Sequence, residues 1–395
     1  VALANGHAAV YPTASPGGWQ LIGRTGFPLF SASRPPYAAL GPGDRVRFKV
    51  GEADGTVEPA AVVVPPWSPP PAARPVAEVE SPGWRAVLQD GGRRAVAAYG
   101  VPSAGPADPV SFLLANALVG NGRDSGTLEI TGGGTRLRAL APCPVAIVGA
   151  CPGVRVDGMD VAADRVVPIE SGQVIEIGPL REGCRTYLAV AGGLVGPEVF
   201  DSLASDALAK LGPGPLATGA RLFAGPWSPP LGDHLSEDAV AETRAGGPAL
   251  ALRVVPGPHP ERFEPGALER LAATVFTVER DSDRVGVRLR AEEGSPWRGA
   301  AVGQGELDSQ GVVTGAIQVP PSGDPVVLGP DHATLGGYPV VGVVASADHG
   351  RLGQSGPGAK VRFVPVTVEE AEAARRTQRR TLEQGVVGTY PLPVY

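Results

Sequence analysis

Four polar side chains interrupt apolar or strand-like stretches of this chain, and each has a chemistry that a binding site could use. Arg284 and Arg288 carry guanidinium groups, which pair bidentately with carboxylate or phosphate, although exposed arginines on strands are also common. Glu129 stands between a leucine and an isoleucine, where an unpaired carboxylate would be costly, so it is the candidate for proton transfer or metal binding. Gln318 interrupts an apolar strand, where its amide must bind a ligand or neighbouring backbone.

Two more candidates belong to a predicted helix in the first half of the chain. Asp108 precedes a proline and an apolar helical face, so it either caps this helix or binds substrate or nucleotide. Asn116, on the same helix, could orient a substrate amide, or could instead form a hydrogen bond with the loop at residues 100–105.

A third group follows Gln318 in the sequence. Asp331, Thr334 and the tyrosine of a Gly-Gly-Tyr-Pro segment, Tyr338, are candidates for binding substrate or nucleotide. Turn formation alone would also explain the two glycines.

Motifs for several other chemistries are absent. The five histidines never fall in HxxxH or HxH spacing, so no zinc site formed by neighbouring residues is predicted, and no metal ligand is assigned. None of the three lysines follows a glycine, which excludes a GxxxxGK[ST] phosphate loop. The single methionine, Met159, has no lysine beside it, so we expect no covalent biotin on this chain. A GxSxG serine elbow is also absent.

Composition indicates a mostly β protein. Fifty-six glycines and 43 prolines separate short runs rich in valine and isoleucine, which is typical of many short strands. The formal charge of −6 gives no field that favours nucleic acid or an anionic membrane, and no window approaches the roughly 18 apolar residues of a spanning helix. With an odd number of cysteines and no secretory signal, we expect a cytoplasmic protein.

Changes in composition divide the chain, whose 395 residues exceed what one core usually holds. The clearest boundary is a proline-rich spacer, and a second is a proline-rich and acidic run near residues 225–247. We expect the chain to start inside a domain. The predicted regions are a domain fragment at 1–55, the spacer at 56–83, barrels at 84–230 and 231–366, and a C-terminal helix with a tail at 367–395.

An internal repeat indicates that the barrels are related. Residues 41–48 recur in similar form at 356–363, and each copy is expected to be a turn entering a strand. A helix is predicted near residues 368–384, where Thr367 and Glu370 form a capping box. Its run of arginines is typical of a solvated face.

Specific strings resemble known families. The beginning of the chain resembles the C-terminal end of the 5-oxoprolinase B subunit, also described as a kinase inhibitor or allophanate hydrolase subunit 1. From residue 84 to about 365 the chain is similar to the 5-oxoprolinase C subunit, which represents the biotin-dependent carboxyltransferase or kinase-inhibitor antagonist family. The strings that carry the resemblance are residues 11–25 and 43–48 for the first family, and 99–108, 128–130, 256–258, 282–286, 315–320 and 336–339 for the second.

The resemblance implies cyclophilin-like β-barrels with a few short helices, and ATP-dependent conversion of 5-oxoproline to glutamate with Mg²⁺ present. It also implies a hetero-oligomer with the remaining part of the B subunit, together with the A subunit. Two alternatives stay open. One is carboxyl transfer from carboxybiotin to urea, since the order B then C is that of urea carboxylase, and the other is a regulatory module that acts on a histidine kinase.

Two positions depart from the family pattern. Leu203 stands where an arginine is usual, and Gln310 replaces a glutamate. Both changes weaken the transfer of a charge-based role to these positions.

Overall fold

A computed structural model describes residues 1–4, 6–10, 20–32, 35–41, 43–51, 67–228, 231–244, 249–297, 299 and 307–388. The chain divides into two compact units, Val1–Trp67 and Ser68–Tyr395. Within the described residues, no helix combines the length and apolar character that a membrane span requires.

The first unit holds a small antiparallel sheet of order β2-β1-β3, with β1 at Ala2–Ala4, β2 at His7–Ala9 and β3 at Gln20–Leu21. A turn entering a strand was expected in the first repeat copy, residues 41–48, and the predicted strand is wrong for residues 43–48. Val46 and Phe48 are each 52% exposed there, and no described strand pairs with this segment. Residues 11–19, most of the first family string, lie outside the described residues.

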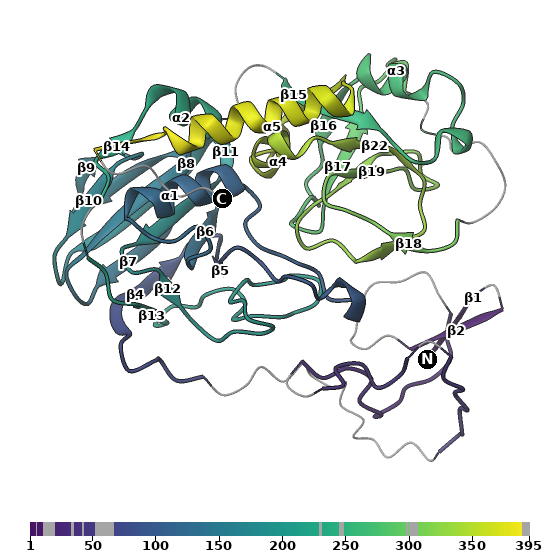
Figure 1. The fold of residues 1–395 in the computed structure, drawn as a ribbon, viewed down its shortest axis with the longest axis horizontal. Coiled ribbons are helices and arrows are strands. Elements are labelled where there is room, and N and C mark those ends of the chain that lie inside the picture. Colours follow the sequence, from purple (N-terminus) through teal and green to yellow (C-terminus); the bar gives the residue numbers. More distant parts are fainter. Residues whose placement is uncertain are drawn as a thin grey trace. The chain divides into compact units, whose positions relative to one another are not determined.

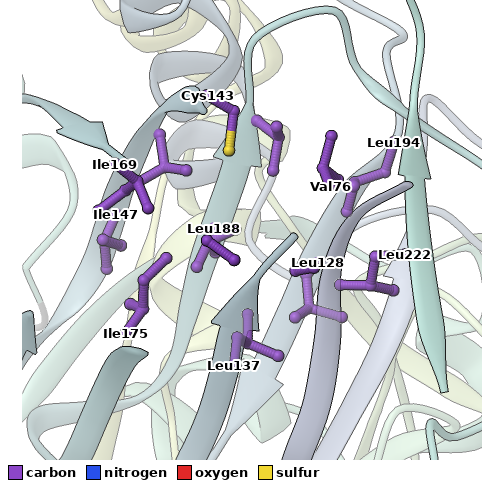
Figure 2. Packing of buried hydrophobic residues seen from close by; sticks show 14 of the residues in the cluster. Val76, Leu128, Leu137, Cys143, Ile147, Ile169, Ile175, Leu188, Leu194 and Leu222 are labelled. Carbon is purple, nitrogen blue, oxygen red and sulfur yellow. The ribbon is translucent and has the colours of Figure 1, made fainter. Parts of the chain in front are cut away.

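The second unit begins with a ten-stranded sheet of central order β10-β8-β11-β7-β4-β13-β12, and β5, β6 and β9 attach beside it (Figure 1). Apolar side chains from opposite strands fill its interior, as Figure 2 shows for Leu128, Leu137, Ile147 and Leu188. The strands are β4 Arg74–Pro82, β5 Arg85–Gln89, β6 Thr127–Thr131, β7 Thr135–Ala139, β8 Cys143–Val156, β9 Met159–Val161, β10 Val166–Ile169, β11 Val174–Val190, β12 Leu194–Val195 and β13 Arg221–Ala224.

Strand β4 corrects the predicted spacer. The expected 56–83 segment ends in this strand, because Val76 and Val79 are buried in the barrel core and β4 pairs with both β7 and β13. The triple glycine forms the predicted turn between β6 and β7, with all three residues at positive φ, which glycine adopts without steric cost.

Helix α1, Pro109–Leu118, covers the outer side of this sheet, where Phe112 meets Tyr187 edge to face. The segment after residue 231 also packs here, which corrects the predicted start of the second barrel. Its strand β14, His234–Leu235, pairs with the late strand β24, Val386–Val387, and its helix α2, Glu237–Glu242, joins the same apolar cluster.

The second sheet is a closed barrel of order β15-β22-β19-β20-β17-β16-β23, closed by parallel pairing of β15 with β23. A separate ladder joins β18 to β21. The strands are β15 Leu250–Pro256, β16 Val275–Val278, β17 Gly286–Ala291, β18 Gln310–Gly311, β19 Ala316–Gln318, β20 Val326–Leu328, β21 Leu335–Gly336, β22 Val340–Val344 and β23 Lys360–Pro365. The second repeat copy thus forms the expected turn and strand.

Short helices accompany the strands of both barrels, and one long helix contacts both barrels. Gln378 of α5, Val368–Glu383, donates to Glu242 of α2 and to the Ala347 carbonyl beside the second barrel (Figure 1). The predicted capping box of α5 is confirmed. The short helices are η1 Ala97–Tyr99, η2 Pro260–Arg262, α3 Ala267–Ala272, η3 Ser346–Asp348 and α4 His349–Gly353. The mostly β, barrel-based fold class is confirmed.

Candidate functional site at the barrel interface

Arg284 lies two residues before β17 and extends from the second barrel to residues of the first. Its guanidinium donates to both oxygens of Asp331, at 3.0 and 2.8 Å, to Glu129 Oε1 at 2.7 Å and to the Gly105 carbonyl at 2.5 Å. The side chain is 4% exposed. Because Glu129 and Gly105 belong to the first barrel, this arginine joins the two barrels and has few donors left for a ligand.

Glu129 lies on β6 with no exposed surface. Oε2 accepts hydrogen bonds from Tyr187 Oη at 2.7 Å and from the Ala107 amide at 3.0 Å, while Arg185 Nε lies 3.6 Å from Oε1. Burial raises the pKa of Glu129, but the positive charges of Arg284 and Arg185 outweigh it and hold the pKa below its ordinary value. Glu129 is therefore a fixed carboxylate, which suits positioning better than proton transfer.

Asp331 completes the interface. Besides Arg284, its Oδ2 accepts the Ala207 amide of the first barrel at 2.9 Å. The neighbouring Asp206 is 5% exposed, and its Oδ2 has no hydrogen-bond partner in the described structure. Burial and the nearby Asp331 charge raise the pKa of Asp206 to about 6.

Asp108 is the N-cap of α1, as one of its two interpretations predicted. Its Oδ1 accepts the amides of Val110 and Ser111, and its Oδ2 accepts Gln354 Nε2 from the second barrel at 2.8 Å. Burial raises its pKa. The Asp108 carboxylate therefore links the start of α1 to Gln354 at the end of α4 by hydrogen bonds, rather than facing a cavity.

Asn116 is fully buried within the first barrel. Its amide donates to the Ser125 carbonyl and to Thr127 Oγ1, and its oxygen accepts Asn121 Nδ2. The bonds go to these residues and not to the loop at 100–105. These hydrogen bonds use the Asn116 amide to stabilise turns within the first barrel.

Gln318 on β19 is 7% exposed, and its Nε2 has no hydrogen-bond partner among the described residues. This nitrogen lies against the backbone of Gly336, where a Cβ would meet it at 2.5 Å. Tyr338 nearby is 47% exposed. Gln310, the departure from the family pattern, contacts His259 Nε2 at 2.5 Å, while His259 Nδ1 accepts the Val340 amide.

Arg288 lies on the outside of the second barrel. Its Nε contacts Asp281 at 3.0 Å, and its side chain is 52% exposed. The structure does not bring it together with Arg284, although both were predicted to bind anionic groups.

Two cavities lie between the barrels, each of about 290 Å³, and Thr314 lines both. Cavity A is lined by Arg185, Arg284, Asp283 and His349 among its polar residues. Cavity B is lined by Arg93, Ser103, His332 and Thr334 among its polar residues. Of the predicted site residues, Arg284 lines cavity A and Thr334 lines cavity B, and the others line neither of these two cavities.

Sequence reasoning missed Arg93 and Arg185, the remaining arginines of the two cavities. Arg93 follows an Asp-Gly-Gly turn directly after β5, and this turn was the signal that could have identified it. Arg185 lies within the long strand β11, where Nη1 bonds the Gly353 carbonyl of the second barrel. Its neighbours in sequence give no sign of that contact.

Within the described residues, no group of three histidine, cysteine or acidic side chains is placed to bind a metal through protein ligands alone. Glu129, Asp331 and Asp108 are already paired, and each cavity is at the lower limit of the roughly 300–1,000 Å³ typical of pockets for drug-sized ligands. The cavities suit one small molecule.

Comparison with known proteins decides the family. The pattern described as "Carboxyltransferase domain, subdomain A and B" matches residues 99–365, and "Carboxyltransferase domain, subdomain C and D" matches residues 1–40. This chain belongs to the carboxyltransferase-domain family, subdomains A and B. The predicted resemblance is thereby confirmed.

Relatives in this family include components of 5-oxoprolinase and urea amidolyases. The chain is 32% identical to the 5-oxoprolinase C subunit of Escherichia coli (strain K12) over 303 residues, which are 76% of this chain and 95% of that protein. It is 30% identical to urea amidolyase of Lachancea kluyveri over 352 residues, which are 80% of this chain but 19% of that protein. A segment of 48 residues is 50% identical to the 5-oxoprolinase B subunit of Escherichia coli O157:H7 and covers 22% of it.

The fold of these carboxyltransferase domains is also shared with a solved structure. The crystal structure of TTHA0988 matches with a TM-score of 0.79 and 34% identity, over 92% of this chain and 70% of that chain. The family and fold are thus shown, and the relatives are parts of enzymes.

Proposed function

We propose that this chain is the component of an ATP-dependent 5-oxoprolinase that corresponds to its C subunit. The complete enzyme converts 5-oxoproline, ATP and water to glutamate, ADP and phosphate. The observation that carries this proposal is the match to a 5-oxoprolinase component over 95% of that protein's length, against 19% of the urea amidolyase. The chain corresponds to nearly a whole protein of the first kind and to a small part of the second.

The geometry supports a substrate of small size. Cavities A and B are each about 290 Å³, which suits a single five-membered lactam. Burial lowers the pKa of His349 in cavity A, so its ring is neutral near pH 7. Its Nε2 donates to the Val344 carbonyl at 3.2 Å, which leaves Nδ1 as an acceptor. The Arg284, Glu129 and Asp331 network fixes the two walls against each other, which is how a site holds a substrate in one orientation.

Further protein completes the enzyme in this proposal. Residues 1–40 match subdomains C and D, and the relatives named as B subunits extend well beyond the matched segment, so the remaining part of the B subunit is the first partner. The second partner is the A subunit. Because the buried carboxylates Glu129, Asp331 and Asp108 are already paired, the proposal assigns nucleotide binding to the partner proteins.

A second candidate is carboxyl transfer from carboxybiotin to urea. It is favoured by the order of the matches, with subdomains C and D before A and B in one chain, and by similarity to a urea amidolyase over 80% of this chain. In this case the biotin is carried by another protein, because the sequence has no biotinyl-lysine pattern.

The two candidates differ in substrate, so one preparation tests both. The chain is copurified with its 5-oxoprolinase partners, and ATP hydrolysis is measured with 5-oxoproline or with urea, bicarbonate, a biotin carboxylase and its biotin carrier protein. The proposal expects ATP hydrolysis that depends on 5-oxoproline and is matched by glutamate. Labelled bicarbonate fixed into a urea product, with no response to 5-oxoproline, would establish the second candidate instead.

A further inference from the structure

Arg93 is a buried cation with a donor that the protein leaves unused. Its Nε donates to the Val199 carbonyl at 3.1 Å and its Nη2 to the Ala204 carbonyl at 2.5 Å. The side chain is 3% exposed, and Nη1 has no hydrogen-bond partner among the described residues. Burial lowers the pKa of Arg93, yet a guanidinium stays protonated in proteins. A charged donor without a partner is costly, which makes it a natural contact for an anionic group.

Cavity B brings this cation together with neutral polar groups. Arg93 is its one charged lining residue in the described structure, beside the hydroxyls of Ser103, Thr314 and Thr334. His332 also lines the cavity, and its Nδ1 bonds the Ala333 carbonyl at 2.7 Å, which leaves Nε2 for another partner. The rest of the lining is mainly apolar, as expected for a small-molecule site with few polar contacts.

The carboxylates near Arg93 do not line the cavity. Asp90, Asp206 and Asp331 all interact with its charge, but none belongs to the wall of cavity B. Asp90 is occupied by Ser202 Oγ and the Leu203 amide, and Asp331 by Arg284. Asp206 has the strongest charge interaction with Arg93; its Oδ1 accepts the Ala209 amide, and its Oδ2 has no hydrogen-bond partner among the described residues. Of these four charged residues, Arg93 is the one that lines cavity B.

We propose that cavity B binds the carboxylate of a small organic acid through Arg93, with the hydroxyls of Thr314 and Thr334 beside it. This inference rests on the proposed function and names its substrate class, a cyclic amide that carries a carboxylate. Urea has no such group and would leave Arg93 Nη1 without an anionic partner. A phosphate group is disfavoured, because phosphate sites gather several cations or backbone amides, whereas this wall has one arginine and no lysine.

Arg93 also supports the loop that carries Val199 and Ala204, so its replacement tests two roles at once. The variant Ser103→Phe separates them, since it fills the cavity and leaves both carbonyl contacts of Arg93 in place. Arg288→Met is the matched control, because it removes the same charge from an exposed ion pair outside the cavities.

Binding is measured by calorimetry on the full chain in complex with its partners. The probes are 5-oxoproline, 2-pyrrolidinone, which is the same lactam without the carboxylate, and inorganic phosphate. We expect 5-oxoproline to bind at least tenfold tighter than 2-pyrrolidinone, and expect R93M and S103F to lose this preference while R288M keeps it. The inference is overturned if folded R93M and S103F bind 5-oxoproline as the unaltered chain does, or if phosphate binds tighter and depends more on Arg93.

A kinetic readout separates this inference from the proposed function. If the complex releases glutamate and its KM for 5-oxoproline is unchanged in R93M and S103F, the Arg93 site is wrong and the proposed function stands. If carboxylate binding depends on Arg93 but the folded complex releases no glutamate, the site stands and the oxoprolinase proposal fails.

Discussion

Arg284 Nη1 of the second barrel donates a 2.7 Å hydrogen bond to Glu129 Oε1 of the first barrel, and both side chains are buried. The same guanidinium holds Asp331 with two bonds, so one arginine pairs with a carboxylate on each side of the interface. Removing one member of such a group leaves the others charged and buried without compensation, which is far more costly than the net value of the pair.

The first prediction concerns this network. Arg284→Met is expected to destabilise the second unit by about 3–5 kcal/mol, because Glu129 and Asp331 lose their common partner. Urea denaturation followed by tryptophan fluorescence measures the free energy of unfolding. Arg288→Met, which breaks only an exposed ion pair, should change it by about 1 kcal/mol or less. Equal effects of the two variants would contradict the role given to Arg284.

The second prediction tests how closely the barrels pack. A Cβ at Gly353 of α4 would lie 2.0 Å from the Ala107 carbonyl oxygen and 3.0 Å from the Asp108 nitrogen, which are backbone atoms of the first barrel. Gly353→Ala should therefore separate the barrels locally and lower stability by about 1–3 kcal/mol or more, as overpacking does. Gly153→Ala, which meets nothing within 4 Å, is the control. If the two variants melt at the same temperature, the interface is looser than the structure indicates.

The third prediction is a pH dependence that originates at Asp206. Its folded pKa of about 6 lies above the ordinary value of 3.8, so the native state binds a proton between these values that the unfolded state releases. Its contribution to stability is fully present below pH 4 and is lost as the pH rises through about 6. The shift of about 2 units corresponds to about 3 kcal/mol.

Asp206→Asn removes this titration and keeps an oxygen for the Ala209 amide. The variant should match the unaltered chain near pH 4 and exceed it in stability near pH 8, as measured by unfolding curves across this range. A stability difference that does not change with pH would show that Asp206 has an ordinary pKa.

The fourth prediction compares two helix caps. Asp108→Ala should cost about 2 kcal/mol or more, because it uncaps α1 and also leaves Gln354 Nε2 without its contact to Asp108. Thr367→Ala at the exposed cap of α5 should cost about 1 kcal/mol. Chemical denaturation measures both. A smaller loss at Asp108 than at Thr367 would contradict its place in the barrel interface.

The sequence predicted those features that depend on local patterns. Both long helices were found from their caps and apolar or charged faces, because capping is decided by a few neighbouring residues. Strand β4 was missed, since prolines on both sides resembled an extended spacer, while its pairing with β7 and β13 is a long-range contact.

Prediction of the site was also limited by contacts between residues that are far apart in the sequence. Glu129 was identified because a carboxylate among apolar residues needs a partner, and its partner proved to be Arg284, 155 residues away. Nothing local identified that pairing or showed that it uses the donors of Arg284 and the acceptor oxygens of Glu129. Arg93 was missed because only folding buries its side chain beside cavity B and leaves Nη1 without a hydrogen-bond partner among the described residues.

Omission and return of this chain test the central claim most directly. The purified partner proteins of the 5-oxoprolinase are assayed for glutamate release from 5-oxoproline and ATP, first without the chain and then with it. The account predicts that glutamate release requires the chain, that adding it restores one glutamate per ATP hydrolysed, and that urea does not substitute. Equal glutamate release by the partners alone would contradict the claim that this chain is a component of the oxoprolinase.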